Sequence, residues 1–170
     1  MGQSTFSGSI RSLGGLYTQG PNAIATISAV NTVLDLSYAG KLIRITNPNA
    51  TITLPATNNS ADSPYSGPGP DPNTLNNMGV TFNFMMDVAA VAAALVTSGV
   101  DHFVGAATVQ GTTTAAFAAN PASATFLTLN GSTTGGLIGS LITVQAVPGA
   151  RWLVKDALLL GSGAVATPFV

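Results

Sequence analysis

Two apolar stretches near the end of the chain alternate with polar residues at a period of two. Residues 141–147 are rich in β-branched side chains, and residues 151–155 place Trp152 and Val154 on one face, because successive side chains of a strand point to opposite sides. Between them, Pro148 presets φ for one central position of a turn and Gly149 accepts a positive φ at the next. The pattern predicts a β-hairpin.

Trp152 is the only tryptophan of the chain, and Arg151 and Lys155 flank it. A single indole beside two cations is compatible with a platform for a ligand. Burial of so large a ring is strongly stabilising, however, so the same pattern fits a core anchor. We expect Trp152 to pack in the core with Val154, Phe82 and Phe84.

The same alternation predicts strands in the first half of the chain. Residues 41–46 and 51–54 alternate, and Asn47-Pro48-Asn49-Ala50 between them is a strong turn signal, which predicts a second hairpin. Residues 23–37 are β-branched and partly alternating, which predicts two short strands. Residues 79–86 alternate well, with Phe82 and Phe84 on one face.

The remaining segments alternate less clearly. The alanine-rich residues 87–98 fit either a helix or a strand, and a strand is preferred. Residues 105–120 are expected to be coil with weak strands, and residues 125–129 to be a short strand. About eight to ten short strands at this spacing predict an all-β chain, a single-domain antiparallel β-sandwich or barrel of a jelly-roll-like kind.

Two segments interrupt the strand pattern. Residues 1–22 are rich in Gly and Ser and are predicted to be an extended N-terminal arm, with free disorder as the alternative; residues 23–170 are then the β domain. Residues 56–78 contain four prolines and are predicted to be a long surface loop of that domain. The candidate contact residues are Phe6, Ile10, Leu13, Leu16 and Tyr17 in the arm, and Tyr65, Pro68 and Pro70 in the loop.

Charge is the most unusual property of the composition. The 170 residues include five Lys and Arg and six Asp, with no Glu and no Cys, so charged residues make up 6% of the chain, against about 25% in ordinary soluble domains. A net charge of −1 without a basic cluster argues against nucleic-acid and anionic-membrane binding. So few charges favour a surface that is covered in an assembly, and a small, neutral, soluble β domain is the alternative.

Candidate chemistry is sparse. Asp101 and His102 are neighbours, but neighbouring side chains of a strand face opposite ways, so the pair is poorly arranged for acid–base catalysis. Asp62 and Asp71 lack the spacing of a calcium loop, one His without Cys offers no zinc site, and no Gly-x-Ser-x-Gly motif is present. We expect no cofactor, no metal and no enzymatic activity. An N-terminus without an apolar signal segment predicts synthesis in the cytoplasm.

Several segments resemble the small β-rich structural proteins of tailed bacteriophages, in particular head decoration (cement) proteins and related fibre modules. They are ATITLPA (50–56), GVTFNF (79–84), VTSGVDHFVG (96–105), SLITVQAVPGARWLV (140–154) and ATPF (166–169). The resemblance covers about residues 40–170 and ends in a Gly-x-x-Trp-x-Val hairpin. The proline-rich residues 56–78 depart from it.

The resemblance implies a protein without catalytic activity that forms a homotrimer and binds the major capsid protein on the surface of the virion. Two other hypotheses remain. In the first, the chain is a tail-fibre or head-fibre module that binds a host receptor through loops such as residues 56–78. In the second, it is an enzyme, such as a glycan hydrolase, that uses Asp101 and His102.

Overall fold

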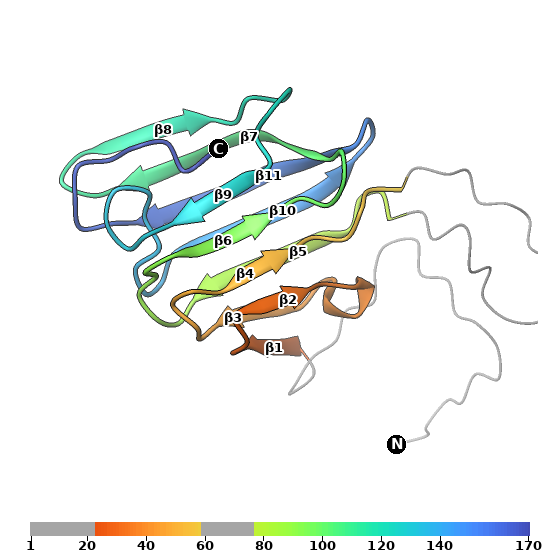
Figure 1. Ribbon diagram of the computed structural model, residues 1–170, viewed down its shortest axis with the longest axis horizontal. Coiled ribbons are helices and arrows are strands. Elements are labelled where there is room, and N and C mark those ends of the chain that lie inside the picture. Colours follow the sequence, from red (N-terminus) through yellow and green to blue (C-terminus); the bar gives the residue numbers. More distant parts are fainter. Residues whose placement is uncertain (1–22, 59–76) are drawn as a thin grey trace, which may run out of the picture.

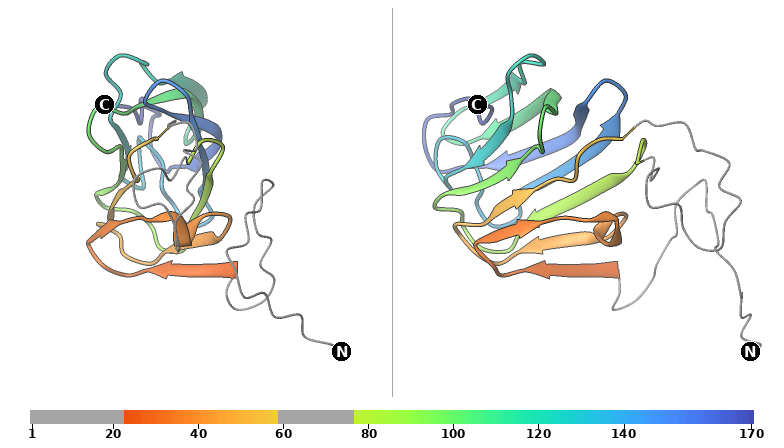
Figure 2. Two further views of the ribbon diagram at one scale, coloured as in Figure 1. Left: turned by 90° about the vertical axis from the view of Figure 1, so that its right-hand side faces the viewer. Right: turned by 45° about the vertical axis from the view of Figure 1, so that its right-hand side comes forward.

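The computed structural model describes residues 23–58 and 77–170. These residues form eleven β-strands and no α-helix, and Leu36–Tyr38 makes a short 3-10 helix. The strands build two sheets, one of seven strands and one of four, which lie face to face (Figure 1 and Figure 2). The prediction of an all-β chain is confirmed.

The larger sheet contains β1 (Ile24–Ile27), β3 (Leu42–Ile45), β5 (Thr81–Met86), β7 (His102–Gln110), β8 (Thr114–Ala118), β10 (Leu141–Val147) and β11 (Arg151–Leu160). The smaller sheet contains β2 (Asn31–Val33), β4 (Thr51–Thr53), β6 (Ala93–Val96) and β9 (Phe126–Leu129). Their strand orders are β1-β3-β5-β10-β11-β7-β8 and β2-β4-β6-β9. In Figure 1 the smaller sheet lies in front of the larger one.

The first six strands wind through the two sheets in turn, so that each coil of the chain supplies one strand to each sheet. β1, β3 and β5 are parallel neighbours in the larger sheet, and β2, β4 and β6 are parallel neighbours in the smaller one. Leu42 lies opposite Ile24, 18 positions later, and Thr51 lies opposite Asn31, 20 positions later. The first coil is therefore 18 to 20 residues long, whichever sheet it is measured in.

The second coil, from β3 to β5, is about twice as long as the first. Asn83 lies opposite Leu42, 41 positions later in the chain. The additional length falls between β4 and β5 and includes residues 59–76, which lie outside the described residues. The proline-rich segment is thus inserted into one coil of an otherwise regular winding.

The predicted hairpin of residues 41–54 is wrong, because β3 and β4 lie in different sheets. The Asn47 Oδ1 atom accepts a hydrogen bond from the Asn49 N–H at 2.9 Å, which begins the turn. The Pro48 carbonyl then accepts hydrogen bonds from the N–H groups of Val91 and Ala92 at 2.8 and 3.1 Å. The turn is therefore a corner between the two sheets, stacked on the corner of the next coil.

The expected antiparallel, jelly-roll-like arrangement is also wrong in its strand pairing. Five of the nine strand pairs are parallel, so both sheets are mixed. A jelly roll consists of antiparallel strands. The winding of β1 to β6 introduces four of the five parallel pairs, because a strand that returns to the same sheet after a full turn runs in the same direction as before. The fifth parallel pair joins β7 and β11.

The predicted hairpin around Pro148 and Gly149 is confirmed as β10 and β11. Gly149 has a φ of 89°, as the turn chemistry predicts, and Ala150 follows with a φ of 56°. β11 continues to Leu160, beyond the predicted end. The register shifts between Thr143 and Val144, which leaves Lys155 unpaired as a β-bulge.

Residues 105–120, expected to be mostly coil, include most of the nine-residue strand β7 and all of β8. β7 lies between β11 and β8, parallel to β11. Gly105 has a φ of 99°, and a Cβ atom there would lie 2.6 Å from the Val154 carbonyl oxygen. The small residues that lowered the strand propensity of this segment allow it to lie close to β11.

The hydrophobic core lies between the two sheets and includes every residue predicted for it. Trp152 and Phe82 are fully buried, Phe84 and Val154 are almost so, and the Trp152 and Phe82 ring centroids are 5.6 Å apart. The smaller sheet contributes Ile52, Leu95, Leu127 and Leu129 from the opposite side. Trp152 is therefore a core anchor and not a platform for a ligand.

Candidate functional site

Asp101 and His102 serve different parts of the fold. Asp101 is 3% exposed, and its carboxylate oxygens accept hydrogen bonds from the backbone N–H and the hydroxyl of Thr57, at 2.7 and 2.9 Å. His102 begins β7 and is half-buried opposite Arg151 of β11. Within the described residues no hydrogen bond joins the two side chains. The Asp101 carboxylate fixes Thr57 and does not orient the imidazole.

A second buried polar side chain holds the same region. The Asn77 Oδ1 atom accepts a hydrogen bond from the Asn58 N–H at 2.7 Å, and its Nδ2 donates to the Ala56 carbonyl at 2.7 Å. The Asn77 N–H also donates to the Asn58 carbonyl at 3.1 Å. The chain entering residues 59–76 is thereby bonded to the chain leaving them. We call Thr57, Asn58, Asn77 and Asp101 the loop clamp.

A cavity of about 400 Å³ opens beside the loop clamp. Its lining consists of Leu34, Asp35, Leu36, Pro55, Ala56, Asn58 and Asn77. The hydroxyl and then the backbone N–H of Ser37 hold the pKa of Asp35 below its usual value, with a smaller effect from the charge of Lys41. The Asp35 carboxylate therefore accepts its hydrogen bond from Ser37, within its own turn.

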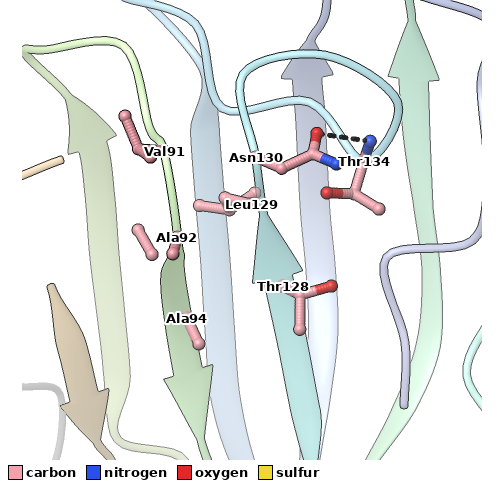
Figure 3. A pocket seen from close by; sticks show the side chains of 8 residues that line it. Val91, Ala92, Ala94, Thr128, Leu129, Asn130 and Thr134 are labelled. Atoms are coloured by element: carbon pink, nitrogen blue, oxygen red, sulfur yellow. Dashed lines mark hydrogen bonds between the residues drawn. The ribbon is translucent and has the colours of Figure 1, made fainter. Parts of the chain in front are cut away.

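A smaller hollow of about 310 Å³ lies on the outer side of the smaller sheet (Figure 3). Val91, Ala92, Ala94 and Thr128 line it from β6, β9 and the corner before β6, and Asn130 and Thr134 close it from the following loop. The Asn130 Oδ1 atom accepts hydrogen bonds from the N–H groups of Ser132 and Thr134. The hollow is thus walled mainly by small apolar side chains of β6 and the corner before it, with a hydrogen-bonded loop at one end.

β1 and β2 form an open end of the sandwich, at the lower side of Figure 1. Among the described residues each of them has a neighbouring strand on one side only. The Ile27 carbonyl accepts from Thr46 on the paired side, so the backbone groups of Thr26 point away from the sheet, because alternate residues of a parallel strand bond to opposite sides. Neither strand contains a charged residue or a proline, the usual protection of an exposed edge.

The structure offers little for metal or catalytic chemistry in the ranges it describes. No group of three or more His, Cys, Asp or Glu side chains is placed to hold a metal ion within residues 23–58 and 77–170. No helix in the same ranges has the length and apolar character needed to cross a membrane. Most ionisable side chains in these ranges are spread over different strands and turns and do not form one cluster.

All eight candidate contact residues from the sequence lie outside the described residues: Phe6, Ile10, Leu13, Leu16, Tyr17, Tyr65, Pro68 and Pro70. The loop clamp was missed by sequence reasoning. A signal for it was present, because Asp101 is one of only six acidic residues in the chain. An isolated Asp inside a strand-rich sequence is commonly buried only when it accepts hydrogen bonds.

Comparison with known proteins returned no match: no family model, no curated protein and no solved structure is similar to this chain.

Proposed function

We propose that this protein is a non-enzymatic decoration protein of a tailed-phage head, which binds the outer shell and stabilises it. The observation that carries the proposal is the open end formed by β1 and β2. Strand edges without charge, proline or bulge are prone to pair with other chains. A protein with such edges avoids aggregation when an assembly covers them. A surface with few charges also favours burial in an assembly, and only 6% of the residues of this chain are charged.

The proposed partners are the major capsid protein and further copies of this chain. A homotrimer is the oligomer that the resemblance to decoration proteins implies. Neutral hydrogen-bonding side chains suit repeated contacts on a lattice, because their burial avoids the large desolvation cost of ions. Each contact can be weak, since neighbouring sites raise the effective concentration.

Binding to phage heads tests this function directly. The purified protein is mixed with expanded, empty heads of the phage that encodes it, and bound copies are counted after sedimentation. We expect on the order of hundreds of copies per head, as the symmetry of a shell requires. We also expect a higher melting temperature of the decorated heads, because a ligand that binds only the folded shell stabilises it. Failure to bind any form of the head would contradict the proposal.

A fibre module that binds a host receptor is the second candidate, and the loop clamp favours it. Binding loops commonly project from a rigid scaffold. Asn77 and Asp101 hold the two ends of the inserted segment 59–76 in place through buried hydrogen bonds. This arrangement suits the presentation of a loop to a partner.

Deletion of residues 59–76 separates the two candidates. A short Gly-Ser linker between Asn58 and Asn77 preserves the clamp, because the two residues are already hydrogen-bonded. If the chain is a receptor-binding module, the deletion abolishes binding of the isolated protein to host cells. If it is a decoration protein, the full chain does not bind host cells and copies per virion stay in the range of a lattice component, whereas a fibre contributes only a few.

A further inference from the structure

The outer edge of β1, at the lower side of Figure 1, presents specific backbone groups to an added strand. β1 is parallel to β3, and the Ile27 carbonyl accepts a hydrogen bond from the Thr46 N–H at 2.9 Å. Because alternate residues of a parallel strand bond to opposite sides, Ala25 and Ile27 bond to β3. The N–H and C=O groups of Ile24 and Thr26 then face the open side. An added strand must therefore place its bonded residues opposite Ile24 and Thr26.

The chain that precedes the sandwich joins it at this same edge. Residues 1–22 lie outside the described residues and lead directly into Ala23, which adopts a 3-10 turn conformation immediately before β1. The backbone therefore turns at the start of the edge strand. A segment tethered by a short linker has an effective concentration on the order of millimolar near its point of attachment. Residues 1–22 are thus favoured over a separate molecule as the occupant of the β1 edge.

The residues just before β1 have the sequence of a chain reversal followed by a strand. Pro21 presets φ for the first central position of a turn, and Asn22 is accepted at the second. Residues 16–19 (LYTQ) contain no charge and no proline, and they include Tyr and Thr, which are frequent in strands. This order of turn and strand residues fits a hairpin in which residues 16–19 run back along β1.

The register of such a hairpin matches the open groups of β1. A reversal centred between positions 21 and 22 sets Gln19 opposite Ile24 and Tyr17 opposite Thr26. Opposite residues of an antiparallel pair alternate between hydrogen-bonded and non-bonded positions. Gln19 and Tyr17 therefore meet the two β1 residues whose backbone groups face the open side.

A further coil of the winding is the other way to cover this edge, and it fits less well. The first coil separates opposite residues by 18 positions, so a preceding coil would set Ser9 opposite Ile27. Ile27 is 3% exposed, and a hydroxyl beside it would lose water without a defined hydrogen-bond partner. The hairpin sets Leu16 opposite Ile27 instead, and an apolar side chain extends the core at this position.

We propose that residues 16–19 form a strand antiparallel to β1, which we call the strap, and that the strap covers the β1 edge of its own molecule. This inference goes beyond the proposed function and does not depend on it. A covered edge prevents two copies from pairing edge to edge before they assemble. β2, whose Val33 is 76% exposed, remains the strand of this end that is open to a partner.

Hydrogen exchange of the isolated, full-length protein tests the strap without any substitution. The Thr26 N–H faces the open side of β1, whereas the Ile27 N–H faces β3. We expect the Thr26 amide to exchange at least about tenfold more slowly than in an unfolded chain, which corresponds to a strap closed in about nine of ten molecules. This protection should not depend on protein concentration, because the strap and β1 belong to one molecule.

Two proline variants show whether the protection comes from the strap. Tyr17→Pro removes the N–H that bonds to Thr26, so the Thr26 amide should exchange at the unprotected rate while the Ile27 amide is unchanged. Thr18→Pro is the matched control. The N–H of Thr18 points to solvent in this register, and proline is tolerated at such a position of an edge strand, so most of the protection should remain.

A pair of cysteines tests the register. The chain contains no Cys, and opposite residues of a bonded antiparallel pair have Cα atoms about 5.5 Å apart, within the range of a disulfide. Tyr17→Cys with Thr26→Cys is equilibrated in a glutathione buffer and compared with Tyr17→Cys and Asn31→Cys, which places the second thiol on the exposed start of β2.

The two cysteine pairs differ little in chain length, so their yields report on structure. They are 9 and 14 positions apart, and an unordered segment would close both loops within about twofold of each other, because loop-closure entropy depends weakly on length. We expect the bridge from position 17 to position 26 to be favoured at least about tenfold over the bridge to position 31. It should form within one molecule.

Every other outcome overturns the strap. Exchange of the Thr26 amide at the unfolded rate means that the β1 edge is open in the isolated protein. A disulfide between two molecules, or protection that rises with concentration, means that a second copy occupies the edge. Similar yields for both cysteine pairs mean that residues 16–19 have no fixed register on β1. None of these results decides whether the protein binds heads, and failure to bind heads would leave the strap standing.

Discussion

Replacing Trp152 by alanine lowers the free energy of unfolding by about 3–5 kcal/mol, the range for loss of a large buried aromatic side chain. Trp152 is fully buried between the sheets and packs on Phe82 with ring centroids 5.6 Å apart. It also lies at the paired end of β11, opposite Ala146 of β10 and Phe103 of β7. The loss therefore affects three adjacent strands of the larger sheet. Urea unfolding followed by circular dichroism measures it.

Trp152→Phe is the matched variant for this prediction. The Trp152 Nε1 atom is buried and has no hydrogen-bond partner in the described part of the chain. Phenylalanine therefore keeps an aromatic ring in the core and removes an unsatisfied donor. We expect a loss of about 1–2 kcal/mol, due mainly to the smaller volume. A loss as large as that of Trp152→Ala would contradict the assignment of Trp152 as a packing residue.

Replacing Asp101 by alanine is expected to destabilise the protein by about 2–4 kcal/mol, because two hydrogen bonds to a charged acceptor are lost. The Thr57 N–H and hydroxyl, which donate to Asp101, are left without that acceptor in a partly buried setting. The change should also loosen one end of the loop clamp. Hydrogen exchange at the Thr57 amide is expected to accelerate, and chemical unfolding gives the total loss.

Asp156→Ala is the control for Asp101. Asp156 is an exposed residue of β11, and its replacement is expected to change stability by less than about 0.5 kcal/mol. If both variants lose the same stability, net charge and not the Thr57 contacts is responsible. If Asp101→Ala leaves the exchange of the Thr57 amide unchanged, Asp101 does not hold Thr57 in place.

The sequence pattern predicted burial much better than it predicted strand pairing. Trp152, Val154, Phe82 and Phe84 were assigned to the core from alternation alone, and all four are buried. Alternation reports which side of a strand is apolar, and that depends only on neighbouring residues. It contains no information about which other strand lies alongside.

The corner at Asn47-Pro48-Asn49-Ala50 shows this difference. The same short polar segment fits a hairpin turn or a crossing from one sheet to the other. Hydrogen bonds from Val91 and Ala92 to the Pro48 carbonyl favour the crossing, and both donors are more than 40 positions away in the chain. Contacts at such a distance along the chain are set by the packing of whole coils.

For the candidate site, too, the sequence indicated local properties but not contacts between distant segments. The sequence drew attention to residues 1–22 and 56–78 through composition, and its contact residues lie outside the described ranges. The loop clamp was not foreseen, because Thr57, Asn77 and Asp101 belong to three separate segments. Their hydrogen bonds join residues 19 to 44 positions apart, so they exist only in the folded chain.

The sequence by itself thus determined that the chain is all-β, that it reverses at Pro148 and Gly149, that Trp152 and Phe82 are buried, and that its surface carries few charges. These properties depend on local conformation and on side-chain chemistry. The tertiary structure alone decided that parallel coils supply three strands to each sheet and that the buried Asp101 holds Thr57, next to the segment 59–76. The physical reason is that strand order and register are set by the joint burial of residues far apart in the chain, a cooperative property that no local pattern contains.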